Sequence, residues 1–208
     1  MIMKRCVVIG GAPINNYEYI RKEINTNDFI IYCDSGLNHL KELNIKPNLI
    51  VGDFDSTDNP NVAIETIILP CEKDDTDTMY GVKEGLKRGF NEFLLIGVIG
   101  NRIDHTLGNI SILLYLDKHS ANGKIIDDYS EIELIKKEPK FIQDDFSYFS
   151  ILSVGEIVNG LSIENAKYRL NEAQIVNYYP LGISNEVIKD SVAKVTIKEG
   201  MALLIKVF

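Results

Sequence analysis

Acidic residues concentrate in two short segments of this chain. Asp53 and Asp55 lie in V-G-D-F-D-S-T-D, directly after an apolar run, and Asp74, Asp75 and Asp77 lie in E-K-D-D-T-D-T. If both segments follow strands of one parallel sheet, their carboxylates meet at the same edge. Like charges at close range favour a bound cation, and carboxylate oxygens suit Mg²⁺, which takes phosphate oxygens as further ligands. The two segments together predict metal binding, although Asp75 taken alone reads as a turn former.

A third segment combines glycines with an arginine, an aspartate and a histidine: I-G-V-I-G-N-R-I-D-H-T-L-G-N-I. It is typical of a buried strand that passes through a glycine turn into a helix. Gly97 and Gly100 would let the backbone approach a ligand, the helix N-terminus offers N–H groups to phosphate, and Arg102 adds a fork-shaped cation. Asp104 fits either a helix N-cap or a ligand of nucleotide or metal. His105 fits either a structural imidazole or a site residue.

Several familiar motifs are absent from the sequence. There is no G-x-x-x-x-G-K-[ST], no G-x-G-x-x-G, no G-x-S-x-G and no H-E-x-x-H, which excludes the usual nucleotide-binding folds by motif. A carboxylate cluster beside an arginine and glycine phosphate site remains, and it favours phosphoryl or pyrophosphoryl transfer. A metal-dependent phosphohydrolase and a catalytically silent nucleotide-binding module are the competing hypotheses.

Strand-like and helix-like segments alternate over the first 120 residues. Strands are expected at 5–10, 29–33, 48–52, 64–69 and 92–98, and helices at 14–23, 36–43, 76–87 and 104–116. This alternation predicts an α/β domain, residues 1–120, with a Rossmann-like, largely parallel sheet and ligands at the carboxyl ends of its strands.

The pattern changes after residue 123. Short strand-like pieces follow at 124–127, 132–136, 148–154, 173–178, 192–197 and 202–207, without a helical period. We therefore expect a second, all-β domain over residues 124–208, built as a sandwich.

Composition bounds the class of protein. Of 208 residues, 45% are hydrophobic and 25% are charged, which indicates a globular chain, and the net charge of −8 offers no overall positive field for nucleic acid. No membrane span is expected, and the N-terminus lacks a signal-peptide pattern, so we expect a cytoplasmic protein. Cys6 and Cys33 lie in apolar runs and are expected to be buried, whereas His39 and His119 are expected to be structural or surface residues.

An ordered set of motifs extends over nearly the whole chain. After an early strand ending in Gly-Gly come C-D-S-G-L-N-H-L, V-G-D-F-D-S, K-D-D-T-D, G-x-x-G-N-R-I-D-H-T-L-G-N-I, G-L-S-I-E-N-A-K-Y-R-L and G-I-S-N-E. In this order they resemble the thiamine pyrophosphokinase family. The resemblance implies an N-terminal α/β catalytic domain, a C-terminal β-sandwich and a homodimer. It also implies Mg²⁺-dependent transfer of the pyrophosphoryl group of ATP to thiamine, which yields thiamine diphosphate and AMP.

The resemblance further implies roles for matching residues. Asp53, Asp55 and Asp77 match the carboxylates that hold Mg²⁺, and Asp34 and Asp77 are candidates for the group that accepts the thiamine hydroxyl proton. Asp75 falls at a variable position and is not included. Positions that match the nucleotide and thiamine sites are Gly11, Lys73, Asp74, Thr76, Gly100, Arg102, Asp104, His105, Asn109, Ser184 and Asn185, of which the last two belong to the thiamine pocket.

One position departs from the family pattern. Where many relatives have Trp in G-L-x-W, this chain has Ile163. The local aromatic candidates for a cationic thiazolium are Tyr168, Tyr178 and Tyr179, whose faces attract a cation by about 0.5–2 kcal/mol. The alternative is that all three are ordinary core or surface aromatics. We expect the all-β domain to carry the acceptor half of the site within a dimer.

Overall fold

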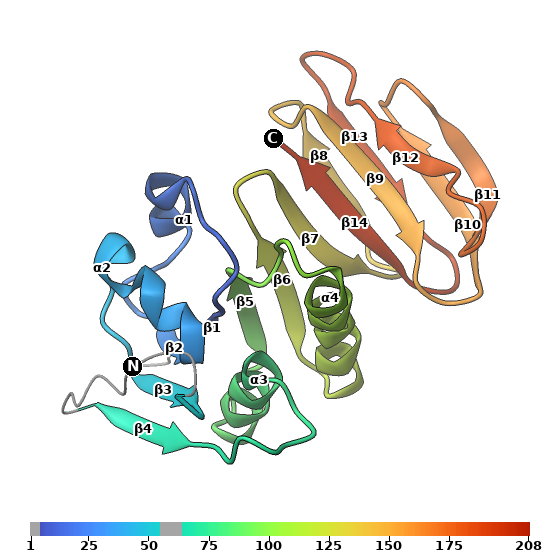
Figure 1. Ribbon diagram of the computed structural model, residues 1–208. Coiled ribbons are helices and arrows are strands. Elements are labelled where there is room, and N and C mark those ends of the chain that lie inside the picture. The colour runs from blue at the N-terminus through green and yellow to red at the C-terminus, as the bar shows by residue number, and fades with distance from the viewer. Residues whose placement is uncertain (1–4, 55–63) are drawn as a thin grey trace. The chain divides into compact units, whose positions relative to one another are not determined.

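The computed structural model describes residues 5–54 and 64–208, so Asp55 lies outside the described residues. The chain forms two compact units, Met1–Asp128 and Tyr129–Phe208 (Figure 1). Helices occur in the first unit, while the second contains strands joined by turns in its described residues. None of the helices in the described ranges combines the length and apolar character needed to cross a lipid bilayer.

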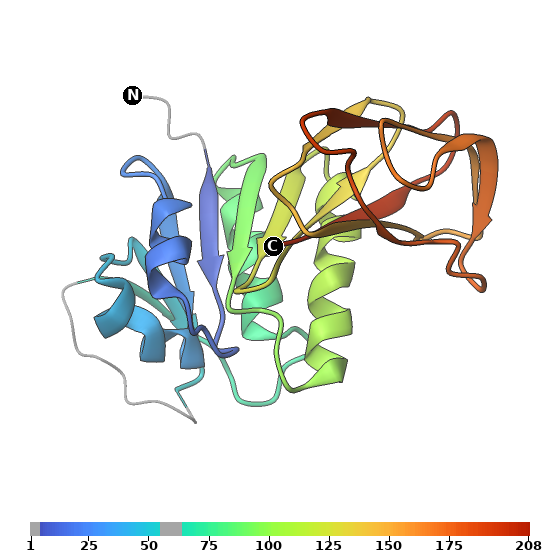
Figure 2. The same cartoon turned by 90° about the horizontal axis from the view of Figure 1, so that it is seen from above.

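A parallel sheet forms the centre of the first unit. Its strands are β1 (Cys6–Ile9), β2 (Phe29–Cys33), β3 (Leu49–Gly52), β4 (Glu65–Ile68), β5 (Glu92–Ile96) and β6 (Asn122–Ile126). Their order is β6-β5-β1-β2-β3-β4, and each of these pairs is parallel. The chain runs outward from β1 to β4 and then returns to the other side of β1, so β1 lies between β2 and β5 (Figures 1 and 2). Such a reversal of direction marks the place where open α/β sheets bind ligands.

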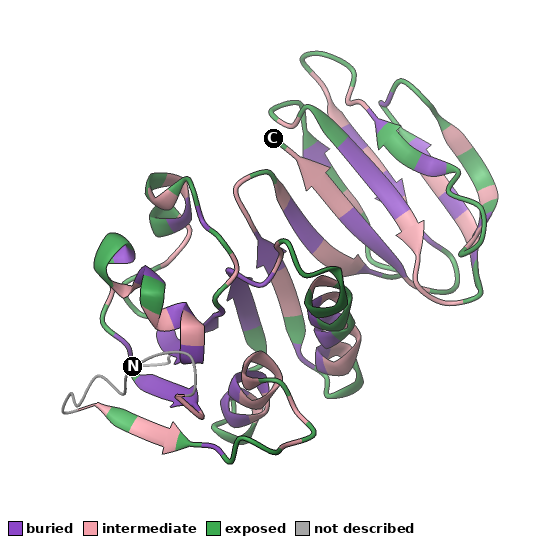
Figure 3. Cartoon of the chain, viewed as in Figure 1, coloured by how far each residue is buried: buried purple, intermediate pink, exposed green. Residues whose placement is uncertain are grey.

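Helices cover the sheet because its strands are apolar on both faces. On one side Val7 and Ile9 share a core cluster with Ile20 of α1 (Tyr17–Lys22) and Leu43 of α2 (Leu40–Leu43). On the other side Gly81 of α3 (Asp77–Lys87) brings that helix against β1 and β2. The last helix, α4 (Ile103–Lys118), packs against β6. The central strands are accordingly buried along their length (Figure 3).

The expected helices at 76–87 and 104–116 are confirmed by α3 and α4, and the helix expected at 14–23 is shorter than predicted. The Asn16 side chain accepts a hydrogen bond from the Tyr19 backbone N–H, so α1 begins after that cap rather than at residue 14. The segment expected as a helix at 36–43 is helical throughout, but its first half belongs to a 3₁₀ helix, η1 (Asp34–His39), and its second half is the single turn of α2.

The second unit consists of two antiparallel sheets. One has the order β12-β9-β14-β7 and the other β11-β10-β13-β8. The strands are β7 (Ser130–Ile135), β8 (Lys140–Gln143), β9 (Tyr148–Ser153), β10 (Ile157–Glu164), β11 (Leu170–Val176), β12 (Gly182–Asn185), β13 (Val192–Thr196) and β14 (Ala202–Val207). Buried residues from both sheets, including Phe149 and Leu161, form one core cluster.

Two expectations about this part of the chain need correction. The compact units divide after Asp128, whereas the sequence predicted domains at 1–120 and 124–208, because the β6 segment pairs in parallel with β5 and supports α4. Strands β8, β10 and β12 were not predicted. In β10 and β12 the alternation of apolar and polar residues is broken by positive φ angles at Gly160 and Ser184 and by shifts of register.

Candidate active site

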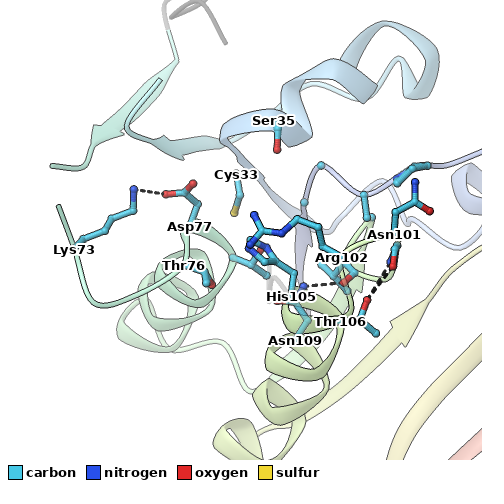
Figure 4. A pocket seen from close by; sticks show the side chains of 18 residues that line it. Cys33, Ser35, Lys73, Thr76, Asp77, Asn101, Arg102, His105, Thr106 and Asn109 are labelled. Atoms are coloured by element: carbon cyan, nitrogen blue, oxygen red, sulfur yellow. Dashed lines mark hydrogen bonds and ion pairs between the residues drawn. The ribbon is translucent and has the colours of Figure 1, made fainter. Parts of the chain in front are cut away.

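A pocket of about 380 Å³ opens at the carboxyl ends of β1 and β5, where the order of the strands in the sheet reverses (Figure 4). Eight of the predicted site residues line it: Gly11, Lys73, Thr76, Asp77, Gly100, Arg102, His105 and Asn109. Sequence reasoning missed several other lining residues, among them Ser35, Thr78, Asn101 and Thr106. Ser35, Asn101 and Thr106 lie inside the motifs that carried the family resemblance, so their positions in those motifs were the available signal.

Two backbone loops form one wall of the pocket. The Gly10 N–H donates to the Ile96 carbonyl and the Ala12 N–H donates to the Gly97 carbonyl, each at 2.8 Å, which joins the loop after β1 to the loop after β5. Gly97 has φ +62°, and a Cβ there would lie 2.5 Å from the Gly10 carbonyl oxygen. Only glycine allows this approach, so Gly97 serves here to bring the two loops together, whereas the sequence predicted that it would let the backbone approach a ligand.

His39 supports the same loop from behind. Its ring is buried, with Nε2 3.0 Å from the Ala12 carbonyl oxygen and Nδ1 2.8 Å from the Tyr17 hydroxyl. The carbonyl can only accept, so Nε2 carries the proton and Nδ1 accepts from Tyr17. Burial lowers the pKa of His39, although the hydrogen bond to Ala12 and the charge of Asp128 act in the opposite direction. Of the structural and surface roles expected for His39, the structural one is therefore confirmed, and it includes holding a wall of the pocket.

This arrangement predicts a specific pH dependence. Because the pKa of His39 is lower in the folded chain than the unfolded value of about 6.5, the folded state resists protonation. The stability that neutral His39 contributes to the folded state is complete above that pH and is lost as the pH falls below it. We expect the melting temperature of His39→Gln to fall less than that of the wild type between pH 7 and 5.5.

Calorimetry at the two pH values measures this, with His119→Gln as the control, because His119 is exposed. Parallel loss of stability in the wild type and in His39→Gln would contradict the assignment.

Three carboxylates converge beside the pocket. Asp34 begins η1 after β2, Asp53 follows β3, and Asp77 begins α3, and each offers an oxygen within 4.8 Å of the others. The Lys73 ammonium pairs with Asp53 and lies 3.1 Å from Asp77 Oδ1. The predicted meeting of the two acidic segments at one edge is thus present for Asp53 and Asp77.

The electrostatics of this cluster fit a hard cation. Burial raises the pKa of Asp77, the charges of Asp53 and Asp34 raise it further, and Lys73 opposes them. Asp77 Oδ1 is buried and receives no well-directed hydrogen bond from the described residues. Buried carboxylate oxygens in excess of nearby cations are suitable ligands for Mg²⁺.

The neighbouring residues of the second acidic segment lie outside this cluster. Asp74 is exposed and does not line the pocket. Asp75 pairs with Lys83 at 2.6 Å, in agreement with its exclusion from the predicted site. Thr76 caps α3 by accepting a hydrogen bond from the Met79 N–H at 3.2 Å. Thr76 therefore sets the direction of the helix that carries Asp77.

The N-terminus of α4 carries the predicted arginine. The helix begins at Ile103 with Arg102 at the N-cap, so the alternative of Asp104 as the cap is wrong. Arg102 instead forms a fork with Asp104, with Nη2 2.6 Å from Oδ2 and Nε 3.3 Å from Oδ1. The hydrogen bonds from Arg102, together with one from the His105 backbone N–H, lower the pKa of Asp104 to about 2. Arg102 and His105 line the pocket, whereas Asp104 does not.

Two polar side chains hold the turn between β5 and α4. Asn109 is buried and donates from Nδ2 to the Val98 carbonyl at 2.7 Å. Thr106 Oγ1 accepts from the Gly100 N–H at 3.2 Å. Asn109, predicted as a nucleotide contact, therefore has its amide nitrogen engaged with the backbone that forms the pocket.

The predicted thiamine residues lie on β12 of the second unit. Asn185 is buried, accepts from the Tyr168 N–H at 2.9 Å and donates to the Tyr168 carbonyl at 2.8 Å. Ser184 is exposed and has φ +57°. Asn185 thus fixes the backbone of Tyr168, while the Ser184 side chain is accessible within this unit.

The aromatic candidates of this unit lie on its surface. Tyr178 is 84% exposed, and Tyr168 and Tyr179 are also exposed, so these rings are not core aromatics, which leaves the alternative of surface aromatics open. Ile163 is 1% exposed and belongs to the core cluster. Its side chain packs in the core between the sheets.

Each of the two units matches a model of a known protein family. The family model described as thiamin pyrophosphokinase, catalytic domain, matches residues 20–125, and the one described as thiamin pyrophosphokinase, vitamin B1 binding domain, matches residues 132–202. The chain belongs to the thiamin pyrophosphokinase family. This confirms the prediction of a thiamine diphosphokinase, a transferase that binds thiamine. The hydrolase and binding-module hypotheses are not supported.

Individual relatives extend over almost the whole chain. A thiamine pyrophosphokinase of Bacillus subtilis (strain 168) is 29% identical over 194 residues, which cover 89% of this chain and 91% of that protein. A crystal structure of thiamine pyrophosphokinase from Bacillus subtilis has a TM-score of 0.87 at 26% identity and covers 98% of this chain and 99% of that one. The yeast enzyme, at 16% identity and a TM-score of 0.80, covers 99% and 86% and shows the same fold.

Proposed function

We propose that the phosphates of ATP bind in the pocket between the 10–13 loop and the N-terminus of α4, and that the pyrophosphoryl group passes from there to thiamine. The observation that carries this proposal is the convergence of Asp34, Asp53 and Asp77 beside that pocket. The thiamine hydroxyl oxygen attacks the β-phosphorus in line and AMP leaves. Such transfer depends on positioning and on neutralising charge, which the glycine loops, Arg102 and the carboxylates supply.

Asp53 and Asp77 would hold Mg²⁺ in this scheme, together with Asp55, which lies outside the described residues. Bound Mg²⁺ neutralises phosphate charge and orients the phosphates. His105 and Arg102 lie across the pocket from Asp77 (Figure 4). We assign them, with Gly11, Gly100 and the cap residue Thr76, to the phosphate side of the site.

A group must accept the proton of the thiamine hydroxyl. Asp34 and Asp77 are both candidates, and Asp34 is favoured because Asp77 is already assigned to the metal. Asp34 is buried within the cluster and has φ +30°, a conformation that non-glycine residues rarely adopt. Backbone held in such a region frequently belongs to a functional site. The strained turn after β2 thus supports Asp34 as the base.

The second unit is proposed as the sandwich that supplies the acceptor side, and the first as the Rossmann-like catalytic domain. Ser184 and the exposed rings of Tyr168 and Tyr179 offer a hydroxyl and aromatic faces to a cationic thiazolium. We further propose a cytoplasmic homodimer, on the strength of the family assignment and the exposed aromatic surface of this unit. Light scattering in solution measures the oligomeric state.

The test of this function is AMP release from ATP and Mg²⁺ with and without thiamine. We expect AMP and thiamine diphosphate in equal amounts, and neither product when thiamine is replaced by an analogue that lacks the hydroxyl group. Release of inorganic phosphate independent of thiamine would indicate a hydrolase instead.

A further inference from the structure

We propose that Lys73 is a built-in counter-ion that holds the carboxylate cluster together in the free enzyme and withdraws to the phosphates of ATP, so that the metal binds tightly only with the nucleotide. This inference rests on the proposed function, because it takes Asp53 and Asp77 as metal ligands. It adds that the site binds metal and ATP cooperatively and that a single side chain links the two.

The first support is the position of the ammonium group. Lys73 Nζ pairs with Asp53 Oδ2 and lies 3.1 Å from Asp77 Oδ1, and the side chains of Lys73, Asp53 and Asp77 are only 16%, 8% and 23% exposed. Burial makes unpaired charge costly, and three carboxylates at this distance repel one another. One ammonium among them keeps the cluster assembled when no metal is bound.

The second support is that Lys73 uses the atoms assigned to the metal. Mg²⁺ bound to carboxylate oxygens approaches them to about 2.0–2.1 Å. An ammonium in contact with the same two carboxylates is then strongly repelled by the cation. Metal binding without a nucleotide must therefore displace Lys73 from Asp53 and Asp77, its two partners in the cluster.

The third support is that the proposed phosphate site lies next to Lys73 and that the Lys73 side chain can rotate towards it. It lines the pocket that is proposed to hold the phosphates and faces it from the side opposite His105 and Arg102 (Figure 4). It lies within residues 69–76, which form neither helix nor strand, so its side chain can turn without breaking either. ATP then offers Lys73 an anionic partner at the moment the metal takes its carboxylates.

The experiment measures binding of Mn²⁺, as a probe for Mg²⁺, by the loss of its free electron paramagnetic resonance signal. The proteins are the wild type, Lys73→Met and Lys83→Met, each with and without α,β-methylene-ATP, corrected by parallel titrations of the nucleotide alone. Lys83 is the matched control because its pair with Asp75 lies outside the cluster. Thermal melting confirms that each variant is folded.

Without nucleotide we expect Lys73→Met to bind Mn²⁺ at least tenfold more tightly than the wild type, and Lys83→Met to match the wild type. With the analogue, this advantage should disappear. Equal or weaker nucleotide-free binding by Lys73→Met overturns the inference while leaving the metal site intact. Absence of Mn²⁺ binding to the wild type even with the analogue overturns the metal assignment itself, and the inference with it.

If Lys73→Met does not fold, Lys73→Gln replaces it, because an amide retains a hydrogen-bond donor without the charge. Its melting temperature should rise more on addition of Mn²⁺ alone than that of the wild type, since a ligand that binds only the folded state stabilises it. An equal or smaller rise overturns the inference.

Discussion

Asp77→Asn is expected to lose at least about 100-fold in turnover while the fold remains intact. The amide retains the shape of the side chain but loses the charge assigned to the metal, and the loss of such a contact removes about 3 kcal/mol or more of transition-state stabilisation. Because Asp77 is buried beside Asp34 and Asp53, removing its charge also relieves repulsion. The melting temperature should therefore not fall. Steady-state kinetics at saturating Mg²⁺ and a thermal melt measure both quantities.

Asp75→Asn is the matched control for this variant. Asp75 is two residues away from Asp77 and pairs with Lys83 outside the cluster. The activity of the Asp75→Asn enzyme should therefore stay within a few-fold of the wild type. Comparable activity in Asp77→Asn would remove Asp77 from the catalytic machinery. A common loss in both variants would point to damage to the loop before α3.

Gly97→Ala is expected to destabilise the chain by about 2–4 kcal/mol and to abolish nucleotide binding. The added Cβ would lie 2.5 Å from the Gly10 carbonyl oxygen, and the φ of +62° disfavours any residue with a side chain. Relief requires the loops after β1 and β5 to separate, which breaks the hydrogen bond from the Ala12 N–H to the Gly97 carbonyl. Denaturant unfolding and titration calorimetry with α,β-methylene-ATP measure the two effects.

Gly108 supplies the control for an added methyl group. It lies within α4, and a Cβ there would meet nothing within 4 Å. Gly108→Ala should stabilise the chain by about 0.5–1 kcal/mol and leave nucleotide binding unchanged. A Gly97→Ala protein as stable as the wild type would show that the two loops are not held in contact.

The parts of the fold that sequence alone could predict are those with a strong local signal. The long helices α3 and α4, the buried strands of the first unit and the meeting of Asp53 with Asp77 were predicted, because hydrophobic period and the shared edge of a parallel sheet determine them. The boundary between the two units at Asp128 was not predicted, because the turn-rich segment before residue 124 resembles a linker. Only the long-range pairing of β6 with β5 shows that β6 belongs to the first unit.

Within the site, the sequence patterns predicted residue types but not the contacts between them. They indicated Arg102 as a cation of the phosphate site, but its fork with Asp104 depends on the exact start of α4. They left His39 as an ordinary structural residue, because its bond to the Ala12 carbonyl joins segments 27 residues apart. Similarly, the ammonium of Lys73 between two carboxylates follows from three elements meeting in space.

The pairing of β1 with β5 also determines when the nucleotide pocket can form as the chain is made. Cys6 pairs with Phe93, so the two walls of the pocket belong to segments that are far apart in sequence. At about 5–20 residues per second of synthesis, β1 waits several seconds for its partner, and closing so long a loop is intrinsically slow. Nucleotide can therefore recognise only chains in which this crossover is complete, and its binding should slow the unfolding that separates β1 from β5.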